Sequence, residues 1–477
     1  MKKFLADKWF LVGIGIILFF TLAYILLILN RYWQFDYFFP DNVYFDTALW
    51  KVAHGLAPII RHNTLGQINI LGDHFHPTIF LFSLLYLISP HQEIIFVGMA
   101  VIYGLSAILG LIIGFKIIKS RFTVLALIIA YFLYLGTQNA FIYGFHEVNL
   151  MPLFFLLTMA GLVFDKKNIY WLGLAFLLLT KESYSVVGVM IGFFTWWSFP
   201  QKRKTAIATI ILAVIYFLAV TKFVIPSFSG RYLYGEVSYP KDLSELVSRL
   251  IIPSEKLKTI FVSFASFGFL PILNIAALPL ILQDLFLRFV FAIPGTVQYR
   301  LDYHYNLALA PLLLFSSFWS LRKFDGKFFG VLVLILSFIF LRFNNPRGPL
   351  LLVLNKDFYA NTQKNLFTWN FLSKVPRNEK IMTQNQFGYV LDHSDVYQIV
   401  TKCDKLQEIN PDLIVVDLRR DQNPNNFVPI TYGRTKNWIS YLLKRGDFKI
   451  YYQDGQSYIL QKIRPIKYEI NEICPEI

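Results

Sequence analysis

Residues 10–29 read FLVGIGIILFFTLAYILLIL, twenty positions without one charged side chain. A helix of about 20 apolar residues crosses the hydrocarbon core of a bilayer. Similar stretches follow at 94–115 and 205–225, and the chain as a whole is 56% hydrophobic and 16% charged. Soluble domains carry about a quarter charged residues. The sequence therefore predicts an integral membrane protein.

About eleven membrane spans are expected, the shorter ones packed among the others. They lie at 10–29, 93–115, 122–136, 148–164, 169–180, 184–199, 205–225, 259–275, 276–293, 303–321 and 328–343. The apolar piece 77–88 is not expected to cross, because a full span there would place basic loops on both sides of the membrane.

Basic residues gather at the ends of these apolar segments. Cytoplasmic loops carry the excess of Lys and Arg, so five clusters are expected inside: Lys2/Lys3/Lys8, Lys116/Lys119/Arg121, Lys166/Lys167, Lys202/Arg203/Lys204 and Arg322/Lys323/Lys327. The N-terminus is then cytoplasmic and the first span uncleaved. The external segments are 30–92, 137–147, 181–183, 226–258, 294–302 and everything after 344. Because this bias accounts for the net charge of +15, no nucleic-acid partner is expected.

The composition becomes that of a soluble protein near Asn344. A transmembrane domain is expected over 1–343, with a large first external loop at 30–92, and a small extracytoplasmic α/β domain over 344–477. Its expected strands are 380–383, 396–400, 412–417, 448–452 and 457–462, with a hairpin turn at Asp454-Gly455 and a helix at 435–445. Cys403 and Cys474 show no metal-ligand spacing, and whether they pair is left open.

Four loops deliver ionisable side chains to the predicted external face. Such groups next to a membrane are costly and are taken as functional candidates. They are Asp36, Asp41, Asp46, Asp73, His74 and His76 in the first loop, then His146 and Glu147, Lys181 and Glu182, and finally Arg300, Asp302, Tyr303 and His304. The cations and histidines suit phosphate, and a first-loop carboxylate suits deprotonation of a hydroxyl.

Each candidate also has a structural interpretation. Asp41 and Asp46 precede an amphipathic stretch, where Asp often caps a helix. Lys181 and Glu182 could form an ion pair that closes a short loop. His304 lies between two tyrosines, which is typical of an interfacial aromatic belt.

A metal site is a further alternative in the first loop. Asp73, His74 and His76 carry suitable ligand atoms, but two histidines two residues apart are weak evidence. Interfacial histidines explain the spacing equally well, so no metal ligand is assigned.

These loops carry a family resemblance. The matching pieces are Asp41-Asn42-Val43-Tyr44-Phe45-Asp46-Thr47-Ala48-Leu49-Trp50, Gly72-Asp73-His74-Phe75-His76-Pro77, Phe145-His146-Glu147, Lys181-Glu182, Tyr303-His304-Tyr305, Asp392-His393-Ser394-Asp395-Val396-Tyr397 and Pro411-Asp412-Leu413-Ile414-Val415-Val416-Asp417. In this order they resemble the prokaryotic multi-span family called domain of unknown function 2079, of the GT-C clan of membrane glycosyltransferases. The family usually has Leu-Gly where this chain has Asn42-Val43, and Gln where this chain has Thr47. The identity of the sugar and of the acceptor is therefore left open.

The resemblance implies a GT-C-like polytopic α-helical membrane protein that acts as a glycosyltransferase of the cell envelope. The donor would be a polyprenyl-phosphate-linked sugar and the acceptor an extracytoplasmic glycan, lipid or protein. Asp41 would be the general base, with Asp46 as the second candidate. The other expected donor-binding residues are Asp73, His74, His76, His146, Glu147, Lys181, Glu182, Arg300, Tyr303 and His304.

The resemblance leaves the cofactor, including any divalent metal, open. A different class of function also fits a multi-span chain, namely a transporter or lipid flippase. Against that alternative, the polar residues gather at one interface and no repeat symmetry is visible. A catalytically inactive scaffold for envelope assembly is the third alternative.

Overall fold

The structure is a computed structural model of the chain. It describes residues 7–37, 41–62, 65–293, 295–324, 326–376, 379–391, 395–399, 403–420, 422, 424–428 and 430–467. The chain forms two compact units. The first comprises Met1–Ile28, Ile59–Leu85 and Ile95–Asn355, and the second comprises Leu29–Pro58, Tyr86–Ile94 and Lys356–Ile477.

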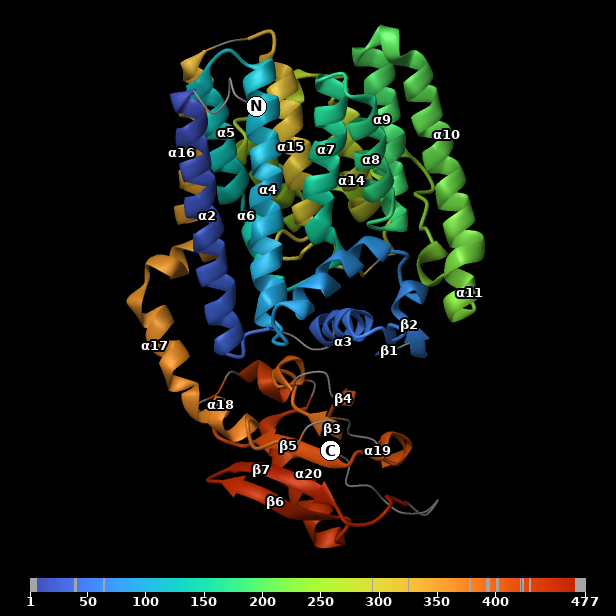
Figure 1. Cartoon of the computed structure of the whole chain (residues 1–477), viewed down its shortest axis with the longest axis vertical. Coiled ribbons are helices and arrows are strands. Elements are labelled where there is room, and N and C mark those ends of the chain that lie inside the picture. Colours follow the sequence, from blue (N-terminus) through green and yellow to red (C-terminus); the bar gives the residue numbers. More distant parts are fainter. Residues whose placement is uncertain are drawn as a thin grey trace. The chain divides into compact units, whose positions relative to one another are not determined.

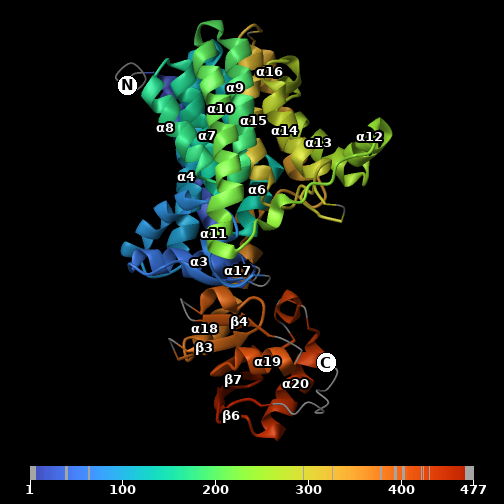
Figure 2. The ribbon, with the colours of Figure 1, turned by 90° about the vertical axis from the view of Figure 1, so that its right-hand side faces the viewer.

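The first unit is a bundle of helices (Figure 1, and turned by 90° in Figure 2). The helices are α2 (Lys8–Trp33), α4 (Glu93–Ile117), α5 (Arg121–Leu133), α6 (Leu135–Tyr143), α7 (Met151–Val163), α8 (Lys167–Leu178), α9 (Ser185–Ser198), α10 (Arg203–Ala219), α11 (Ile225–Ser229), α12 (Leu243–Ile251), α13 (Glu255–Ser266), α14 (Leu278–Phe289), α15 (Asn306–Leu321) and α16 (Lys327–Phe343). Helix α7 packs on α8, α9 on α10 and α5 on α16. A small hairpin of β1 (Ile59–His62) and β2 (Gly66–Asn69) completes the unit.

All eleven expected spans contain a helix of this bundle. Among the described residues, four helical segments are long and apolar enough to cross a membrane by themselves, namely Lys8–Trp33, Glu93–Ile117, Arg121–Tyr143 and Pro200–Ser229. The remaining helices are shorter, so the total of eleven crossings stays a prediction.

Two of the expected boundaries are wrong. The loop placed at 137–147 is helical up to Tyr143, and the helix ends only at Gly144, whose φ of 111° suits a residue without Cβ. The segment 259–275 is not one helix, because α13 ends at Ser266 and Phe269 adopts a left-handed φ of 56°. Residues 77–88, expected not to cross, form a 3₁₀ helix, η2, at Pro77–Leu87.

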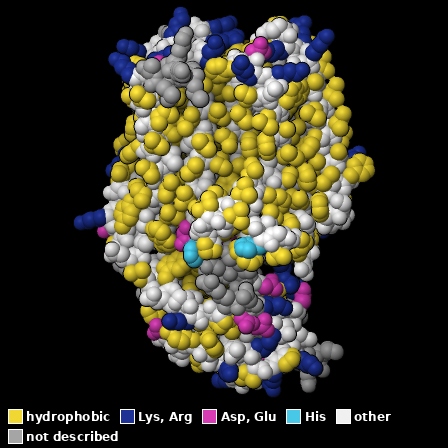
Figure 3. Space-filling view, viewed as in Figure 1, with side chains coloured by type: hydrophobic (Ala, Val, Ile, Leu, Met, Phe, Trp, Pro, Cys, Tyr) yellow, Lys and Arg dark blue, Asp and Glu magenta, His cyan; other side chains and the backbone are white. Residues whose placement is uncertain are grey.

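The outside of the bundle is as apolar as its inside. Figure 3 shows hydrophobic side chains over the middle of the helical unit, with Lys and Arg gathered at the end where α10 and α16 begin. On α10, Ile207, Ile211 and Ile215 are exposed four residues apart, so one side of the helix is apolar. Such a stripe suits contact with lipid.

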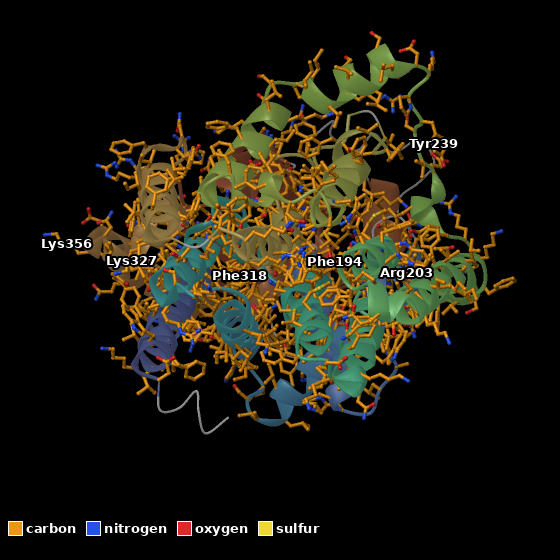
Figure 4. The ribbon with its side chains drawn as sticks, turned by 90° about the horizontal axis from the view of Figure 1, so that it is seen from above. Phe194, Arg203, Tyr239, Phe318, Lys327 and Lys356 are labelled. Carbon is orange, nitrogen blue, oxygen red and sulfur yellow. The ribbon has the colours of Figure 1, made fainter. Side chains whose placement is uncertain are left out.

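Aromatic side chains fill the centre of the bundle. In the view along the bundle, Phe194 and Phe318 lie between Arg203 and Lys327, which mark its two sides (Figure 4). The Phe194 ring meets Trp319 edge-on, with centroids 5.2 Å apart. Phe194 and Phe318 are both buried, and edge-to-face contacts of this kind add to the gain from burial.

Close packing of α7 against α8 depends on glycine. A Cβ added at Gly161 would run into the backbone of Tyr170, and one at Gly173 would lie 2.6 Å from the Thr158 nitrogen. Gly161→Ala is therefore expected to destabilise the protein by about 1–3 kcal/mol through overpacking. The measurement is the thermal-unfolding midpoint of the purified protein in detergent. Gly15→Ala is the control, because no atom lies within 4 Å of the added Cβ, and equal midpoints for the two variants would contradict this account.

The second unit contains the main sheet. Its strands are β3 (Lys380–Thr383), β4 (Asp395–Gln398), β5 (Leu413–Asp417), β6 (Phe448–Asp454) and β7 (Ser457–Lys462), in the order β4-β3-β5-β7-β6. Its helices are α3 (Asp41–Ala53), α17 (Lys356–Lys364), α18 (Leu366–Leu372), α19 (Cys403–Ile409) and α20 (Tyr432–Arg445). β3, β4 and β5 are parallel, and β7 pairs antiparallel with both β5 and β6.

This sheet confirms the α/β character expected of the C-terminal region. All five residues of β5 are buried. Ile414 and Val416 of this strand pack into one cluster with Trp438, Ile439 and Leu442 of α20 and with Leu460 of β7. The hairpin between β6 and β7 turns at Asp454-Gly455 as expected, and Gly455 has a positive φ of 56°. Cys474 and the side chain of Cys403 lie outside the described residues, as do Asp392, His393 and Ser394.

Candidate functional site

Four turns of the first unit converge on one polar cluster. They follow or precede apolar helices, so the bundle fixes their positions. They are 73–76 before η2, 144–147 between α6 and the 3₁₀ helix η3 (Glu147–Leu150), 181–182 between α8 and the 3₁₀ helix η4 (Glu182–Tyr184), and 303–305 before α15. We refer to the side chains that these turns contribute as the polar cluster.

Glu182 is the most enclosed member of the polar cluster. Its side chain is fully buried, yet its carboxylate accepts three hydrogen bonds. The donors are His74 Nδ1 at 2.7 Å, the backbone N–H of Phe75 at 3.1 Å and the Tyr232 hydroxyl at 3.1 Å. Burial alone would raise the pKa of Glu182, but the neighbouring His74 and Lys181 lower it to about 2.

The ring of His74 also has an aromatic neighbour. Its ring stacks on Tyr234 with centroids 4.1 Å apart, and the Tyr234 hydroxyl donates to Asp73 at 2.7 Å. Burial and Lys181 lower the pKa of His74, but Glu182 and Asp73 outweigh them and raise it above its ordinary value. The Glu182 carboxylate thus favours the protonated form of His74.

Lys181 and Glu147 form the second ion pair. Lys181 Nζ donates to Glu147 Oε1 at 2.7 Å, and the two side chains are only 14% and 4% exposed. The alternative interpretation, an ion pair between Lys181 and its neighbour Glu182, does not hold, because the extended backbone at Lys181 points adjacent side chains in different directions. Burial would lower the pKa of Lys181, but Glu147 and Glu182 raise it.

Imidazole rings line another part of the polar cluster. His146 and His304 are buried and stack with centroids 3.9 Å apart, and Tyr143 lies beside both rings. The His146 backbone N–H donates to Asn149 Oδ1 at 2.8 Å, which fixes the start of η3. Within the described part of the chain, His304 Nδ1 is buried without a hydrogen-bond partner.

His76 and Tyr303 lie at the edges of this arrangement. The His76 ring is 6.3 Å from that of His74, and burial lowers the pKa of His76 to about 4, so it is neutral at pH 7. The Tyr303 ring is 5.3 Å from that of Tyr143. Arg300 differs from the rest, because it is exposed and donates to Asp302 at 2.6 Å.

Three of the first-loop aspartates, Asp36, Asp41 and Asp46, belong to the second unit. Asp46 lies in α3, is buried, and accepts a hydrogen bond from the Tyr86 hydroxyl. Asp41 is the first residue of α3, and its side chain lies outside the described residues. The amphipathic stretch expected after Asp41 is thus a helix.

The sequence did not point to Tyr232 or Tyr234, although both bond directly to the polar cluster. They come from the turn after α11, in the piece Gly230-Arg231-Tyr232-Leu233-Tyr234-Gly235. Two tyrosines between glycines were the available signal, but this pattern is common in loops. Burial and the adjacent carboxylates raise the pKa of both hydroxyls, so they remain donors.

No three His, Cys, Asp or Glu side chains of the described residues are placed to hold a metal ion. Asp73, His74 and His76 are instead engaged as above, with His62 Nε2 3.7 Å from Asp73. The polar cluster as described is a network of ion pairs and stacked rings.

The His74–Glu182 pair should make stability depend on pH. The pKa of folded His74 is above its ordinary 6.5, so its contribution is complete below about pH 6.5 and is lost as the pH rises through the folded value. The pKa of Glu182, about 2, is below its ordinary 4.5, so its contribution is lost only as the pH falls from there towards 2. The difference in unfolding midpoint between the wild type and His74→Gln should therefore be largest between about pH 4.5 and 6.5. A difference that does not fall as the pH rises above 6.5 would contradict the pairing.

Comparison with solved structures identifies the fold. The chain is similar to ArnT from Cupriavidus metallidurans bound to undecaprenyl phosphate, with 11% identity, a TM-score of 0.52, and coverage of 97% of this chain and 100% of ArnT. It is similar to the apo state of ArnT with 10% identity, a TM-score of 0.52, and coverage of 94% and 97%. The fold is therefore similar to that of ArnT.

Sequence comparison gives the family. No curated protein sequence matches the chain. The family model described as "Predicted membrane protein (DUF2079)" matches residues 31–458, which include all of the polar cluster and most of the C-terminal sheet. The chain therefore belongs to the DUF2079 family of membrane proteins.

Proposed function

We propose that the protein is a membrane glycosyltransferase that moves a sugar from a polyprenyl-phosphate-linked donor to an acceptor outside the cytoplasm. The observation that carries this proposal is the polar cluster, in which four distant turns place acids, a lysine and imidazoles together at helix ends. The likeness to ArnT supports it, because the ArnT structure holds undecaprenyl phosphate.

The reaction is a displacement at the anomeric carbon of the donor sugar. The acceptor hydroxyl oxygen forms the new bond to this carbon while the bond to the phosphate oxygen breaks. The lipid phosphate leaves with the bonding electrons, and the acceptor proton passes to a carboxylate. The protein must therefore stabilise negative charge on the leaving phosphate and supply a base.

Lys181 is the proposed main contact for the phosphate. It donates one hydrogen bond to Glu147, so two of its three N–H groups remain for an anion. The ring N–H groups of His146 and His304 are further donors. Arg300, which is exposed and pairs with Asp302, is proposed to act at the entrance for the phosphate, next to Tyr303.

The sugar is proposed to bind near Asp73, His74 and His76. Tyr234 offers an aromatic ring, and Asp73 offers an acceptor for sugar hydroxyls. Glu182 holds His74 in place through the 2.7 Å bond, so we propose that it positions this part of the site. Glu147 does the same for Lys181.

The general base is proposed to be Asp41, with Asp46 as the second candidate. Asp46 already accepts from Tyr86 and is buried, which favours a supporting role and leaves Asp41 as the stronger candidate. The protein is proposed to span the cell membrane several times. Its N-terminus is proposed to be cytoplasmic and its C-terminal domain extracytoplasmic.

Binding of radiolabelled polyprenyl phosphate to the detergent-purified protein tests the phosphate site. His304→Phe keeps a ring against His146 but removes its nitrogens, and is expected to weaken binding about tenfold or more, as loss of a hydrogen bond to a charged group does. His54→Phe, at an exposed ring just after the end of α3, is the control and should bind normally. Equal affinities for both variants would remove His304 from the site, and no binding by the wild type would favour a transporter instead.

A further inference from the structure

A cavity lies in the first unit, apart from the polar cluster. It has a volume of about 410 Å³ and is formed by α12, the start of α13, the end of α14 and the turn that follows. Its lining combines the cations Arg249, Lys256 and Arg288 with the apolar and aromatic side chains of Phe289, Ile293 and Tyr299. None of these residues belongs to the polar cluster.

Two of the three cations have carboxylate partners. Arg249 donates to Glu245 at 2.6 Å and to the carbonyl oxygen of Val290 at 3.0 Å. Arg288 donates to Asp284 at 2.6 Å and to the Asn306 side chain at 3.1 Å. Both guanidinium groups are therefore neutralised and hold the walls of the cavity together.

Lys256 is the exception. It is 8% exposed, and its ammonium donates to the carbonyl oxygens of Arg249 at 2.6 Å and Phe289 at 2.8 Å. It also lies 5.1 Å from the centre of the Tyr299 ring. No carboxylate of the described ranges forms an ion pair with it. A buried charge without a counter-ion is costly, so the cavity contains one uncompensated positive charge.

Helix α12 shows where this cavity meets its surroundings. Leu243, Val247 and Ile251 are 74%, 46% and 39% exposed, and their spacing of four puts them on one side of the helix. The helix stands out from the bundle in two perpendicular views (Figures 2 and 4). An amphipathic helix beside membrane spans lies in the interface with its apolar side against lipid, so the cavity behind α12 is within reach of lipid headgroups.

We propose that this cavity binds the phosphodiester headgroup of a membrane lipid, with Lys256 as its counter-ion. A phosphodiester carries one negative charge, which matches the single uncompensated ammonium. Phe289 and Ile293 provide apolar surface for the first carbons of the lipid chain. Two sources share this chemistry, a bulk anionic phospholipid and a polyprenyl-phosphate sugar. Because its residues differ from those of the polar cluster, this site does not depend on the proposed transferase activity.

Native mass spectrometry of the full-length protein in detergent tests the site. Phosphatidylglycerol, a polyprenyl-phosphate sugar and uncharged diacylglycerol are titrated separately, and one tightly bound lipid phosphodiester that depends on Lys256 is expected, besides any donor held at the polar cluster. Lys256→Gln should weaken this binding about tenfold through loss of a charge-assisted hydrogen bond. Lys258→Gln is the matched control, because Lys258 lies on the same helix but is exposed.

A second variant tests the same site in case Lys256→Gln fails to fold. Ala292 lines the cavity, and Ala292→Trp should weaken the same binding by filling the space while leaving Lys256 in place. Lys256-dependent binding of phosphatidylglycerol would identify bulk phospholipid as the ligand, and such binding of the polyprenyl-phosphate sugar alone would identify that lipid. The proposal is overturned if Lys256→Gln binds both phosphodiester lipids as tightly as Lys258→Gln does. It is also overturned if diacylglycerol binds as tightly as the phosphodiester lipids.

Discussion

Lys181→Met is expected to destabilise the protein by about 3–5 kcal/mol, because removal of one partner leaves a buried charge uncompensated. The Lys181–Glu147 pair has a separation of 2.7 Å, and Glu147 is 4% exposed. Without the ammonium, the Glu147 carboxylate would remain buried without the partner that donates to it. The unfolding midpoint of the detergent-purified protein should therefore fall sharply.

The double variant Lys181→Met/Glu147→Gln separates charge pairing from simple packing. It removes both charges, so it should recover much of the stability lost in the single variant. Arg300→Gln is the control, because it breaks an exposed ion pair with Asp302 and should change stability by less than about 1 kcal/mol. Equal midpoints for the single and double Lys181 variants would show that the pair does not act as described.

Asp41→Asn is expected to lower turnover of a lipid-linked donor by about 10²–10⁴-fold, the usual contribution of a general base. Asn keeps the size of the side chain but cannot accept the acceptor proton at neutral pH. Donor binding should be unchanged, since the proposed phosphate contacts lie on other residues.

Two aspartate controls accompany this variant. Asp357→Asn changes an exposed position on α17 and should leave turnover intact. Asp46→Asn alters the buried acceptor of the Tyr86 hydroxyl, so it should reduce the yield of folded protein more than the specific turnover. If Asp41→Asn turns over donor at the wild-type rate, Asp41 is not the base, and loss of specific turnover in Asp46→Asn would transfer that role.

Much of the fold is predictable because it depends on local patterns. Apolar runs such as 10–29 predict helices directly, and the alternation around Asp454-Gly455 predicts the β6–β7 hairpin. The helix break at Phe269 was not predictable, because the sequence there stays apolar while the backbone turns. Helix α6 was missed because Gln138 and Asn139 read as polar loop residues, whereas both are buried and bonded to backbone carbonyl oxygens.

For the candidate site, the sequence predicted which turns lie close together better than which side chains form pairs. The number of predicted crossings between the turns with Glu147, Lys181 and His304 put all three on one side of the membrane. The structure gathers these turns into one cluster. Which side chains pair could not be predicted, because the contacts join residues far apart in the chain. Glu182 bonds to His74, 108 residues away, and not to its neighbour Lys181.

The most direct test of the central claim is turnover by the purified full-length protein. A panel of radiolabelled polyprenyl-phosphate sugars is supplied with envelope glycans, lipids and proteins as acceptors, and release of the lipid phosphate is followed. The glycosyltransferase account predicts release by the wild type and almost none by Asp41→Asn. Donor that is neither bound nor consumed, together with substrate flux in liposomes, would contradict the account and establish a transporter.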